Sequence, residues 1–441
     1  MNAQFDVLAK KTREALVRPD FLRGDPITGD RYYSVDFMQK EWEHVFTRTW
    51  QVGAVEAQFP KVGCVVTHEI GNESILMIRD EGDRIRAFYN VCQHRGNRMI
   101  NCEETQVRRL VCSYHSWCYG LNGQLLIAKD SEDFPQGNPV GKLSLKELRC
   151  ETFAGLVWIN MDHDAIPLRD SLGVVADQFE AYEMDKMVRV MHLTAEVDCN
   201  WKVIQDNFNE SYHVQSLHKE LATHIDDDYQ NTDFELYQNG HSRMLMKGHL
   251  PAGPNKSKKV QAPLDSLMRD WGLDPAEFDG QVERVRSAMQ VQKRKLGAGR
   301  GYTQYDNLSD DQLTDYHHYT LFPNLSFTLA AESFQILRPQ PHPTDPEKCL
   351  FDHWFFVRPS EGEPDVGTPL GELVPPKPAK HHVFKHGEAS MGFVADQDLS
   401  IAIAQQRGFH SRGYQDSYLA RQEDRVRRYH ERINDYIAGS I

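Results

Sequence analysis

The sequence predicts an α+β protein that combines a small all-β domain with a larger domain of mixed helices and strands. Between residues 48 and 165, short runs of β-branched and aromatic residues alternate with turn signals, a pattern typical of a small all-β domain. From residue 166 to 441 helical and strand-like patterns are interleaved, and residues 1–47 have helix-like patterning with charged punctuation. We therefore expect residues 1–47 to belong with 166–441, and 48–165 to be inserted between them.

The individual elements follow from local patterns. In the β-rich part we expect strands at 63–67, 74–78, 85–89, 109–112, 124–127 and 151–160, with Asn122-Gly123 as a hairpin signal. In the larger domain we expect a helical stretch at 198–218, strands at 325–329, 333–337 and 351–357, and terminal helices at 399–407 and 414–437. Residues 251–300 begin with Pro and Gly and continue into a charged helix at 282–295, which predicts an inserted, mobile cap.

Composition and charge exclude several classes of protein. With 50 Lys and Arg against 64 Asp and Glu, the formal charge of −14 argues against the basic surface that nucleic-acid binding requires. The longest apolar stretches, such as 153–161, are far too short to span a membrane, and the N-terminus lacks the pattern of a secretory signal. Eight cysteines are too few for a disulfide scaffold, so we expect a cytoplasmic protein whose cysteines are buried thiols or metal ligands.

Two cysteines and two histidines have the spacing of a metal site. Cys92-Gln-His94 is followed, after the 17 residues 95–111, by Cys112-Ser-Tyr-His115. Two thiolates and two imidazoles suit a tetrahedral zinc ion. They equally suit a [2Fe–2S] cluster in which two cysteines bind one iron and two histidines bind the other.

The residues around these ligands closely resemble the Rieske family. They read Cys92-Gln-His-Arg-Gly and Cys112-Ser-Tyr-His-Ser-Trp-Cys-Tyr-Gly-Leu-Asn-Gly-Gln-Leu. The resemblance implies a [2Fe–2S] cluster bound by Cys92, His94, Cys112 and His115. Respiratory-type Rieske proteins have a second cysteine pair that links the two loops, where this sequence has Asn97 and Tyr114. The resemblance is therefore to the cytoplasmic oxygenase type.

Two further histidines, His213 and His218, follow Asn200-Trp-Lys and are preceded by Glu210. A mononuclear iron(II) that activates O₂ needs two histidines, one carboxylate and open positions. Residues five apart lie about 140° apart around an ideal α-helix. Both histidines can therefore bind one metal only if the helix ends, or takes a wide turn, between them. Glu210 and His213 are three residues apart and share a helix face.

The block Asp206-Asn-Phe-Asn-Glu-Ser-Tyr-His-Val-Gln-Ser-Leu-His resembles the catalytic motif of Rieske non-haem iron oxygenases. The resemblance implies that His213 and His218 bind a mononuclear Fe(II). In the trimers of this family, the acid at the position of Glu210 connects a Rieske histidine of one subunit to an iron-binding histidine of its neighbour. Glu210 is accordingly expected to link His213 to His115 of the adjacent chain as an inter-subunit electron bridge. The common residue at this position is Asp, and Glu is found in a subgroup of monooxygenases.

The third iron ligand is expected far along the chain. In the family, an acidic residue precedes a C-terminal Gln-Arg-Gly by eight to ten positions, and Asp398 lies eight residues before Gln406. Asp398 is the expected ligand and Asp396 is the alternative. A competing interpretation of Asp398 is a helix N-cap before Leu399-Ser-Ile-Ala.

The resemblance covers residues 50–408 and implies a Rieske domain together with a helix-grip catalytic domain, in which a curved antiparallel sheet folds over a long C-terminal helix. It also implies a homotrimer, with or without a small beta subunit. Because the sequence has neither a Rossmann glycine fingerprint nor a P-loop, electrons are expected from a separate NAD(P)H-dependent reductase, directly or through a ferredoxin.

The implied activity is that of a terminal oxygenase that uses O₂ and these electrons to hydroxylate an aromatic or other hydrophobic small molecule. The alternative is an N- or O-demethylating monooxygenase acting on a quaternary amine or methoxy substrate, which Glu210 favours and the 251–300 insertion weakly opposes. An alternative of another class, a cluster-bearing electron carrier or ligand-binding sensor, leaves the second ligand set unexplained.

For two further groups of side chains, the sequence leaves two interpretations open. An apolar pocket or plain core is expected for Phe208, Leu217, Leu321, Phe322, Leu325, Phe327 and Phe334. A surface or structural position is expected for His224, His317, His318 and His353.

Overall fold

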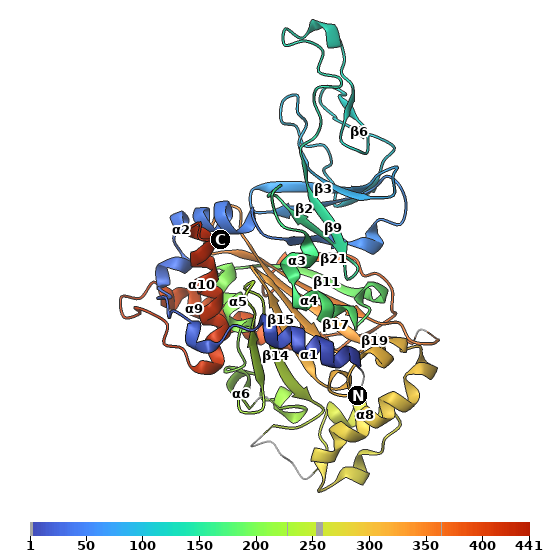
Figure 1. Ribbon diagram of the computed structural model, residues 1–441, viewed down its shortest axis with the longest axis vertical. Helices are drawn as coiled ribbons and strands as arrows, with labels where there is room; N and C mark the ends of the chain where they lie inside the picture. Colours follow the sequence, from blue (N-terminus) through green and yellow to red (C-terminus); the bar gives the residue numbers. More distant parts are fainter. Residues whose placement is uncertain (1–2, 227, 253–258, 363) are drawn as a thin grey trace. The chain divides into compact units, whose positions relative to one another are not determined.

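The computed structural model describes residues 3–226, 228–252, 259–362 and 364–441. The chain divides into two compact units, of which the larger joins Met1–Lys40 to Leu172–Ile441 and the smaller is Glu41–Ser171 (Figure 1). The smaller unit is built on β-sheets and the larger one combines a sheet with helices, so the α+β class expected from the sequence is confirmed. The domain limits at residues 48 and 165 remain sequence-based predictions.

The smaller unit contains a seven-stranded antiparallel sheet in the order β1-β10-β9-β4-β3-β2-β5 and a three-stranded sheet in the order β6-β7-β8. The strands are β1 (Gln51–Val55), β2 (Cys64–Ile70), β3 (Glu73–Arg79), β4 (Ile85–Tyr89), β5 (Glu104–Gln106), β6 (Leu110–Val111), β7 (Cys118–Tyr119), β8 (Leu125–Ile127), β9 (Glu147–Phe153) and β10 (Leu156–Asn160).

Two turns shape this unit. Asn122-Gly123 lies between β7 and β8, as its hairpin signal predicts; Gly123 has a φ of 81°, and a Cβ there would collide with the ring of Phe88. The prediction of one strand over 151–160 was wrong, because β9 and β10 form a hairpin. Ala154 and Gly155 at its turn have φ values of 56° and 74°, as a two-residue type I′ turn requires. Alanine gives no sequence signal for that conformation.

The larger unit contains a nine-stranded sheet in the order β12-β14-β15-β16-β17-β18-β11-β21, with β13 paired to β14. Neighbouring strands are antiparallel except β11 and β21, which are parallel. The strands are β11 (Val188–Val197), β12 (Ile225–Asp226), β13 (Asp233–Leu236), β14 (Ser242–Gly248), β15 (Tyr316–Leu321), β16 (Leu325–Leu329), β17 (Ser333–Pro341), β18 (Cys349–Val357) and β21 (His381–Lys385), while β19 (Val366–Gly367) and β20 (Leu373–Val374) form a separate pair. The three strands predicted from the sequence correspond to β16, β17 and β18.

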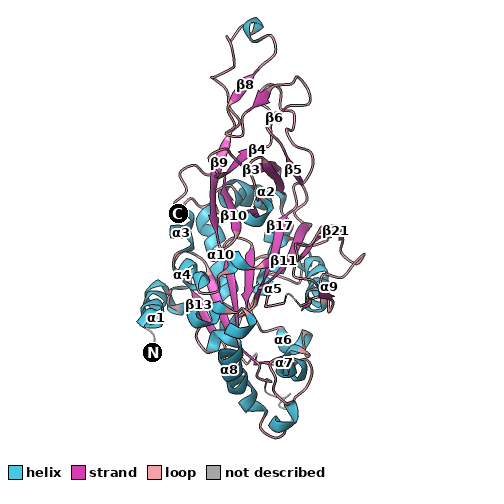
Figure 2. Cartoon of the chain, turned by 90° about the vertical axis from the view of Figure 1, so that its right-hand side faces the viewer, coloured by secondary structure: helices cyan, strands magenta, loops and turns pink. Residues whose placement is uncertain are grey.

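The α-helices of the described residues belong mostly to the larger unit. They are α1 (Ala3–Ala15), α2 (Val35–Glu41), α3 (Leu168–Leu172), α4 (Val174–Glu180), α5 (Trp201–Phe208), α6 (Val214–Leu217), α7 (Leu264–Asp270), α8 (Val285–Leu296), α9 (Phe393–Phe409) and α10 (Asp424–Ile437). Helix α5 packs against α9 and against strands β17 and β18 (Figure 2). None of the described helices combines the length and the apolar character that a membrane crossing requires.

Two predicted segments differ in detail from the structure. The helix predicted at 414–437 begins only at Asp424. Within 251–300, residues 253–258 lie outside the described part, and the rest of the segment contains α7 and α8. Helix α8 buries Val285, Met289 and Lys293, whose ammonium group donates to Glu332 at 2.7 Å. The described part of this insertion therefore has a packed face of its own.

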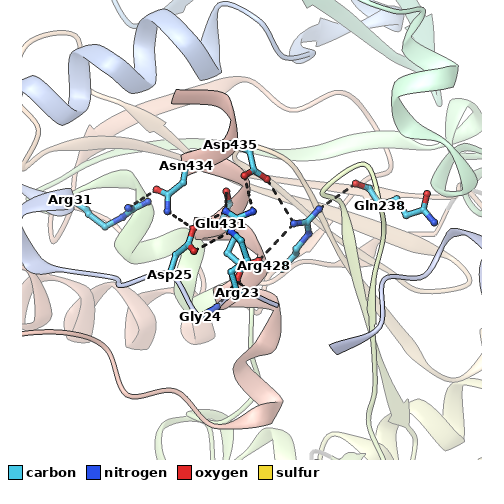
Figure 3. A network of polar contacts seen from close by, with 9 residues as sticks. All are labelled: Arg23, Gly24, Asp25, Arg31, Gln238, Arg428, Glu431, Asn434 and Asp435. Carbon is cyan, nitrogen blue, oxygen red and sulfur yellow. Dashed lines mark hydrogen bonds and ion pairs between the residues drawn. The ribbon is translucent and has the colours of Figure 1, made fainter. Parts of the chain in front are cut away.

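The C-terminal helix α10 is fastened to the N-terminal segment by a polar network (Figure 3). The buried carboxylate of Glu431 accepts hydrogen bonds from the backbone N–H groups of Arg23 (2.5 Å) and Gly24 (2.9 Å). The Arg23 side chain also reaches Asp435 at 2.9 Å and Asp25 at 2.7 Å. These contacts fix the C-terminal end of α10.

Candidate functional site

A loop of the smaller unit presents Cys92 and His94. The N–H of Cys92 donates to the carbonyl of Asn97 at 2.8 Å, and the N–H of Gly96 donates to the carbonyl of Cys92 at 3.0 Å. Gly96 has a φ of 73°, a left-handed conformation that glycine adopts readily. The loop thus closes on itself and holds both potential metal ligands.

A second loop, carrying Cys112 and His115, repeats this arrangement. The N–H of Cys112 donates to the carbonyl of Trp117 at 2.9 Å, and the N–H of Ser116 donates to the carbonyl of Cys112 at 3.0 Å. Ser116 has a φ of 56° and takes the place that Gly96 has in the first loop. The sequence did not indicate this conformation of Ser116, because serine has no marked preference for a positive φ.

The four potential ligands of the two loops lie close together. The rings of His94 and His115 have centroids 4.5 Å apart, and the Cys92 and Cys112 thiols are both buried and interact with each other. Nδ1 of His94 is buried and has no hydrogen-bond partner among the described residues. A buried ring nitrogen without a partner is costly unless something binds it, so this set fits a metal cluster.

Two neighbours of the cysteines were not recognised from the sequence. The hydroxyl of Tyr119 accepts a hydrogen bond from the N–H of Gln93 at 3.1 Å and lies 3.4 Å from Sγ of Cys92. The amide of Asn97 lies 3.6 Å from Sγ of Cys112 and so connects the first loop to the second. Asn97 therefore forms a polar link where respiratory-type relatives are expected to have a disulfide.

His213 and His218 flank a single turn of helix in the larger unit. Helix α5 ends at Phe208, and the short helix α6 has His213 as its N-cap residue and His218 as its C-cap residue. The backbone of His218 is no longer helical, with φ −111° and ψ 56°. The requirement that the helix end near these residues is therefore met, and the two rings lie 5.1 Å apart at an angle of 79°.

Asp398 from α9 meets both histidines. Its Oδ1 lies 2.8 Å from Nε2 of His218 and 3.5 Å from Nε2 of His213. One ligand atom from each of the three residues lies within 4.8 Å of the others, the donor set suited to mononuclear iron(II). The side chains of His218 and Asp398 are 2% and 6% exposed, whereas that of His213 is 21% exposed. The accessible side of the site is therefore the His213 side.

Asp396, the alternative ligand, makes its hydrogen bonds elsewhere. Its carboxylate accepts hydrogen bonds from Ser390 Oγ at 2.5 Å and from the Met391 N–H at 2.8 Å, just before α9 begins at Phe393. The competing interpretation of Asp398 as an N-cap was wrong, because Asp398 lies inside α9.

Two oxygen acceptors orient the histidine rings. Glu210 Oε1 lies 2.6 Å from Nδ1 of His213, and Gln397 Oε1 lies 2.6 Å from Nδ1 of His218. With an oxygen as the partner of each Nδ1, each ring directs its Nε2 toward Asp398, where it is placed to bind a metal. Burial lowers the pKa of His218, but hydrogen bonding to Asp398 outweighs it and the net pKa is raised.

The contact between Glu210 and His213 was expected, but not its setting. Neither residue lies within a helix, since they belong to the turn between α5 and α6. Oε2 of Glu210 accepts hydrogen bonds from the backbone N–H groups of Tyr212 and, at 3.2 Å, of His213. Both carboxylate oxygens of Glu210 thus order the segment that carries the first histidine.

Gln406 connects α9, which carries Asp398, to the start of α5. Its Oε1 accepts a hydrogen bond from the N–H of Asn200 at 2.9 Å, and Asn200 is the N-cap of α5. The Asn200 side chain in turn accepts from the N–H of Lys202 at 3.0 Å. Through this hydrogen bond, the helix that carries Asp398 is tied to the start of α5.

The remaining candidates are mostly buried. The four additional histidines are between 3% and 9% exposed, which excludes a surface position and supports a structural one: His224, His317, His318 and His353. Of the candidate pocket residues, Leu217 is partly exposed and the others are buried, with Phe327 stacked on Phe334 and Phe322 on Tyr436. These aromatic contacts favour core packing.

A cavity of about 710 Å³ lies in the larger unit, bordered by α1, β14 and the segment 309–317. Charged residues line it, and several are already paired, including Arg243 with Glu235 and Arg286 with Asp315. His213, His218 and Asp398 do not line this cavity.

Two protein families match this chain, one in each of its two units. Residues 49–137 match the family described as Rieske [2Fe-2S] domain, and residues 184–439 match the family described as Ring hydroxylating alpha subunit (catalytic domain). A solved structure of a quaternary ammonium Rieske monooxygenase, described for carnitine oxidation by gut microbiota and inter-subunit electron transfer, has a TM-score of 0.67 at 18% identity. That match covers 96% of this chain and 99% of the other.

Curated relatives match over part of the chain. The carnitine monooxygenase oxygenase subunit of Escherichia coli (strain K12) is 34% identical over 189 residues, 42% of this chain and 50% of the relative. The glycine betaine monooxygenase oxygenase subunit of Pseudomonas aeruginosa (strain UCBPP-PA14) is 31% identical over 183 residues, 41% of this chain and 42% of the relative. The chain thus spans about half the length of the curated relatives it matches. Since the catalytic-domain family covers more than half of the chain, the protein belongs to the ring-hydroxylating alpha-subunit family of Rieske non-haem iron oxygenases.

Proposed function

We propose that the chain is the oxygenase component of a Rieske monooxygenase acting on a quaternary ammonium compound. The observation that carries the oxygenase assignment is the convergence of His213, His218 and Asp398 within 4.8 Å of one another. We assign these residues as ligands of mononuclear Fe(II), and Cys92, His94, Cys112 and His115 as ligands of a [2Fe–2S] cluster. When bound, these groups supply O₂ activation and single electrons, respectively.

The chain's own residues prepare both sites. Glu210 and Gln397 hold the Nδ1 protons of His213 and His218, so that both rings offer Nε2. The low exposure of His218 and Asp398 keeps water from that side, and the more exposed His213 leaves a side open to substrate. We assign Glu210 as the electron bridge to His115 of an adjacent subunit, in a homotrimer that a separate NAD(P)H-dependent reductase supplies.

The substrate class rests on the relatives. The named curated relatives oxidise carnitine or glycine betaine, and Glu210 has the side chain expected of a monooxygenase subgroup. These relatives give no support to the expectation of an aromatic hydrocarbon, and they favour the demethylation alternative. Hydroxylation of an N-methyl carbon consumes O₂, two electrons and two protons and forms water; the C–N bond of the product then breaks, releasing formaldehyde, a tertiary amine and a proton.

A substrate panel tests this proposal. The holoenzyme, a surrogate reductase and NADH would be offered carnitine, glycine betaine, choline or naphthalene, and aldehyde and amine products would be measured by mass spectrometry. We expect O₂-dependent cleavage of at least one quaternary amine, lost in the variant His213→Ala. Oxidation of naphthalene alone would contradict the substrate class. Absence of any O₂-dependent product would support the carrier or sensor alternative.

A further inference from the structure

Arg425, near the start of α10, is a buried guanidinium that contacts neutral groups. Its side chain is 1% exposed. It donates to Ser242 Oγ at 3.0 Å, to Thr320 Oγ1 at 2.9 Å and to the backbone carbonyl of Phe208 at 3.4 Å. Among the described residues, none of these hydrogen bonds reaches a carboxylate. A buried cation without an ion-pair partner carries a large desolvation penalty, so this placement calls for a reason.

The Phe208 carbonyl is the acceptor that an extension of α5 would need. In a continued α-helix, the N–H of residue 212 donates to the carbonyl of residue 208. Here the N–H of Tyr212 donates instead to Oε2 of Glu210, while Arg425 donates to the carbonyl of Phe208. Glu210 therefore takes up the N–H group, and Arg425 the carbonyl group, that would form the next hydrogen bond of a longer α5.

The next residue along the chain belongs to the same arrangement. Asn209, the C-cap residue of α5, accepts a hydrogen bond through Oδ1 from Thr320 Oγ1 at 2.6 Å, and Thr320 accepts from Arg425. Both residues that immediately precede Glu210 are thus held, directly or through Thr320, by one guanidinium. The positive charge also lies at the C-terminal end of α5, where the helix dipole favours a cation.

Two sets of contacts hold α10, one toward its C-terminal end and one with α5 itself. Glu431 and Asp435 fasten the helix to Arg23 and Gly24 at one end (Figure 3). Closer to α5, Nε2 of His430 lies 3.0 Å from Oδ1 of Asp206. Burial lowers the pKa of Arg425 to about 9, so the side chain remains charged at neutral pH.

We propose that Arg425 is a positioning residue for the mononuclear iron site, which ends α5 at Phe208 and so sets the chain path to Glu210 and His213. This inference rests on the proposed function, in that it assumes a metal at His213. It assigns the C-terminal helix a part in building the site although α10 supplies none of the proposed ligands.

The test compares two variants of the same helix in the cluster-loaded protein. Arg425→Gln removes the contact with α5, and Glu431→Gln loosens the anchor of α10 six residues away. Iron(II) dissociation constants of the mononuclear site would be measured by equilibrium dialysis, with thermal midpoints and the nitrosyl EPR signal of the site recorded in parallel. Arg425→Gln is expected to weaken iron(II) binding about 10- to 100-fold, as for other groups that orient metal ligands. Glu431→Gln is expected to lower the thermal midpoint while leaving the iron(II) dissociation constant within about twofold.

A second readout does not depend on metal. Amide hydrogen exchange of residues 208–214 in the iron-depleted protein should change in Arg425→Gln and not in Glu431→Gln. If Arg425→Gln does not fold, Thr320→Val, which cuts the link to Asn209 and keeps the cation, should show the same two effects more weakly. Wild-type iron affinity and exchange in these variants, or equal losses in Glu431→Gln, would overturn the inference. If the wild-type protein binds no mononuclear iron, while its hydrogen exchange at residues 208–214 still differs from that of Arg425→Gln, the proposed function would be refuted and the contact of Arg425 with α5 would stand.

Discussion

The side-chain oxygen of Gln397 lies 2.6 Å from Nδ1 of His218, and the neighbouring residue Asp398 lies 2.8 Å from Nε2 of the same ring. Two consecutive residues of α9 therefore hold both nitrogens of one imidazole. His213 is held differently, because its Nδ1 contacts the charged Glu210. At Nδ1, therefore, His218 has a neutral partner and His213 an anionic one.

Replacing Gln397 tests this arrangement. In Gln397→Leu the ring of His218 loses the acceptor for its Nδ1 proton, so its orientation and tautomer are no longer fixed. We expect iron(II) binding to weaken about 10-fold or more, measured by dialysis against a chelator. Gln397→Glu retains an acceptor and should remain much closer to wild type. Equal losses in both variants would indicate that the site tolerates no change at 397 rather than needing an acceptor there.

Glu210→Gln tests the bridge. The amide oxygen can still accept from Nδ1 of His213 and keep the ring oriented, but the substitution removes the negative charge of the bridge. We expect metal content and visible spectrum to be retained, with a large loss of product formed in a single turnover of pre-reduced protein. Product formation at the wild-type rate would show that the bridging role is wrong.

Tyr119→Phe tests the cluster site. The Tyr119 hydroxyl is 3.4 Å from Sγ of Cys92, and a hydrogen bond to a cluster sulfur stabilises the reduced, more negative form. Removing the hydroxyl should lower the reduction potential, measured by a redox titration followed by circular dichroism. The substitution of Tyr114, an exposed residue of the same segment, by Phe serves as the matched control. An unchanged potential in Tyr119→Phe would exclude this hydrogen bond.

Buried histidines predict acid sensitivity of the larger unit. Burial lowers the pKa of His224 and His353 to about 4 and that of His249 and His318 to about 3, well below the usual 6.5. Between pH 6.5 and about 4 the unfolded chain binds protons that the folded one does not, so stability falls as pH is lowered, by about 1.4 kcal/mol per pH unit for each histidine. Urea unfolding from pH 7 to pH 5 measures this. Stability that is constant or rises toward pH 5 would contradict the burial of neutral imidazoles.

The proposed metal ligands could be predicted from the sequence more completely than the residues that hold them in place. Two short motifs contain the proposed cluster ligands Cys92, His94, Cys112 and His115. Such motifs can be recognised from the sequence because each loop brings its own two ligands together. Asp398, 180 positions beyond His218, was reachable only through its spacing to Gln406.

The supporting residues could not be predicted for physical reasons. Gln397 contacts His218 only because of the face that α9 turns toward this histidine. Arg425 reaches Phe208 only because of where α10 packs. Both arrangements are set by tertiary contacts. Ser116 and Ala154 adopt positive φ although their side chains give no preference for it. The helix expected from Tyr414 was too long because periodicity does not reveal where a helix starts without a clear cap.

The most direct test of the account is the amount of iron and acid-labile sulfide per chain in protein purified without oxygen. We predict three irons to two sulfides, one cluster at the paired loops and one iron at His213, His218 and Asp398. In Asp398→Ala the ratio should fall to two irons with two sulfides retained. Two irons to two sulfides in the wild-type protein, after incubation with iron(II), would leave the cluster assignment standing and contradict the oxygenase function.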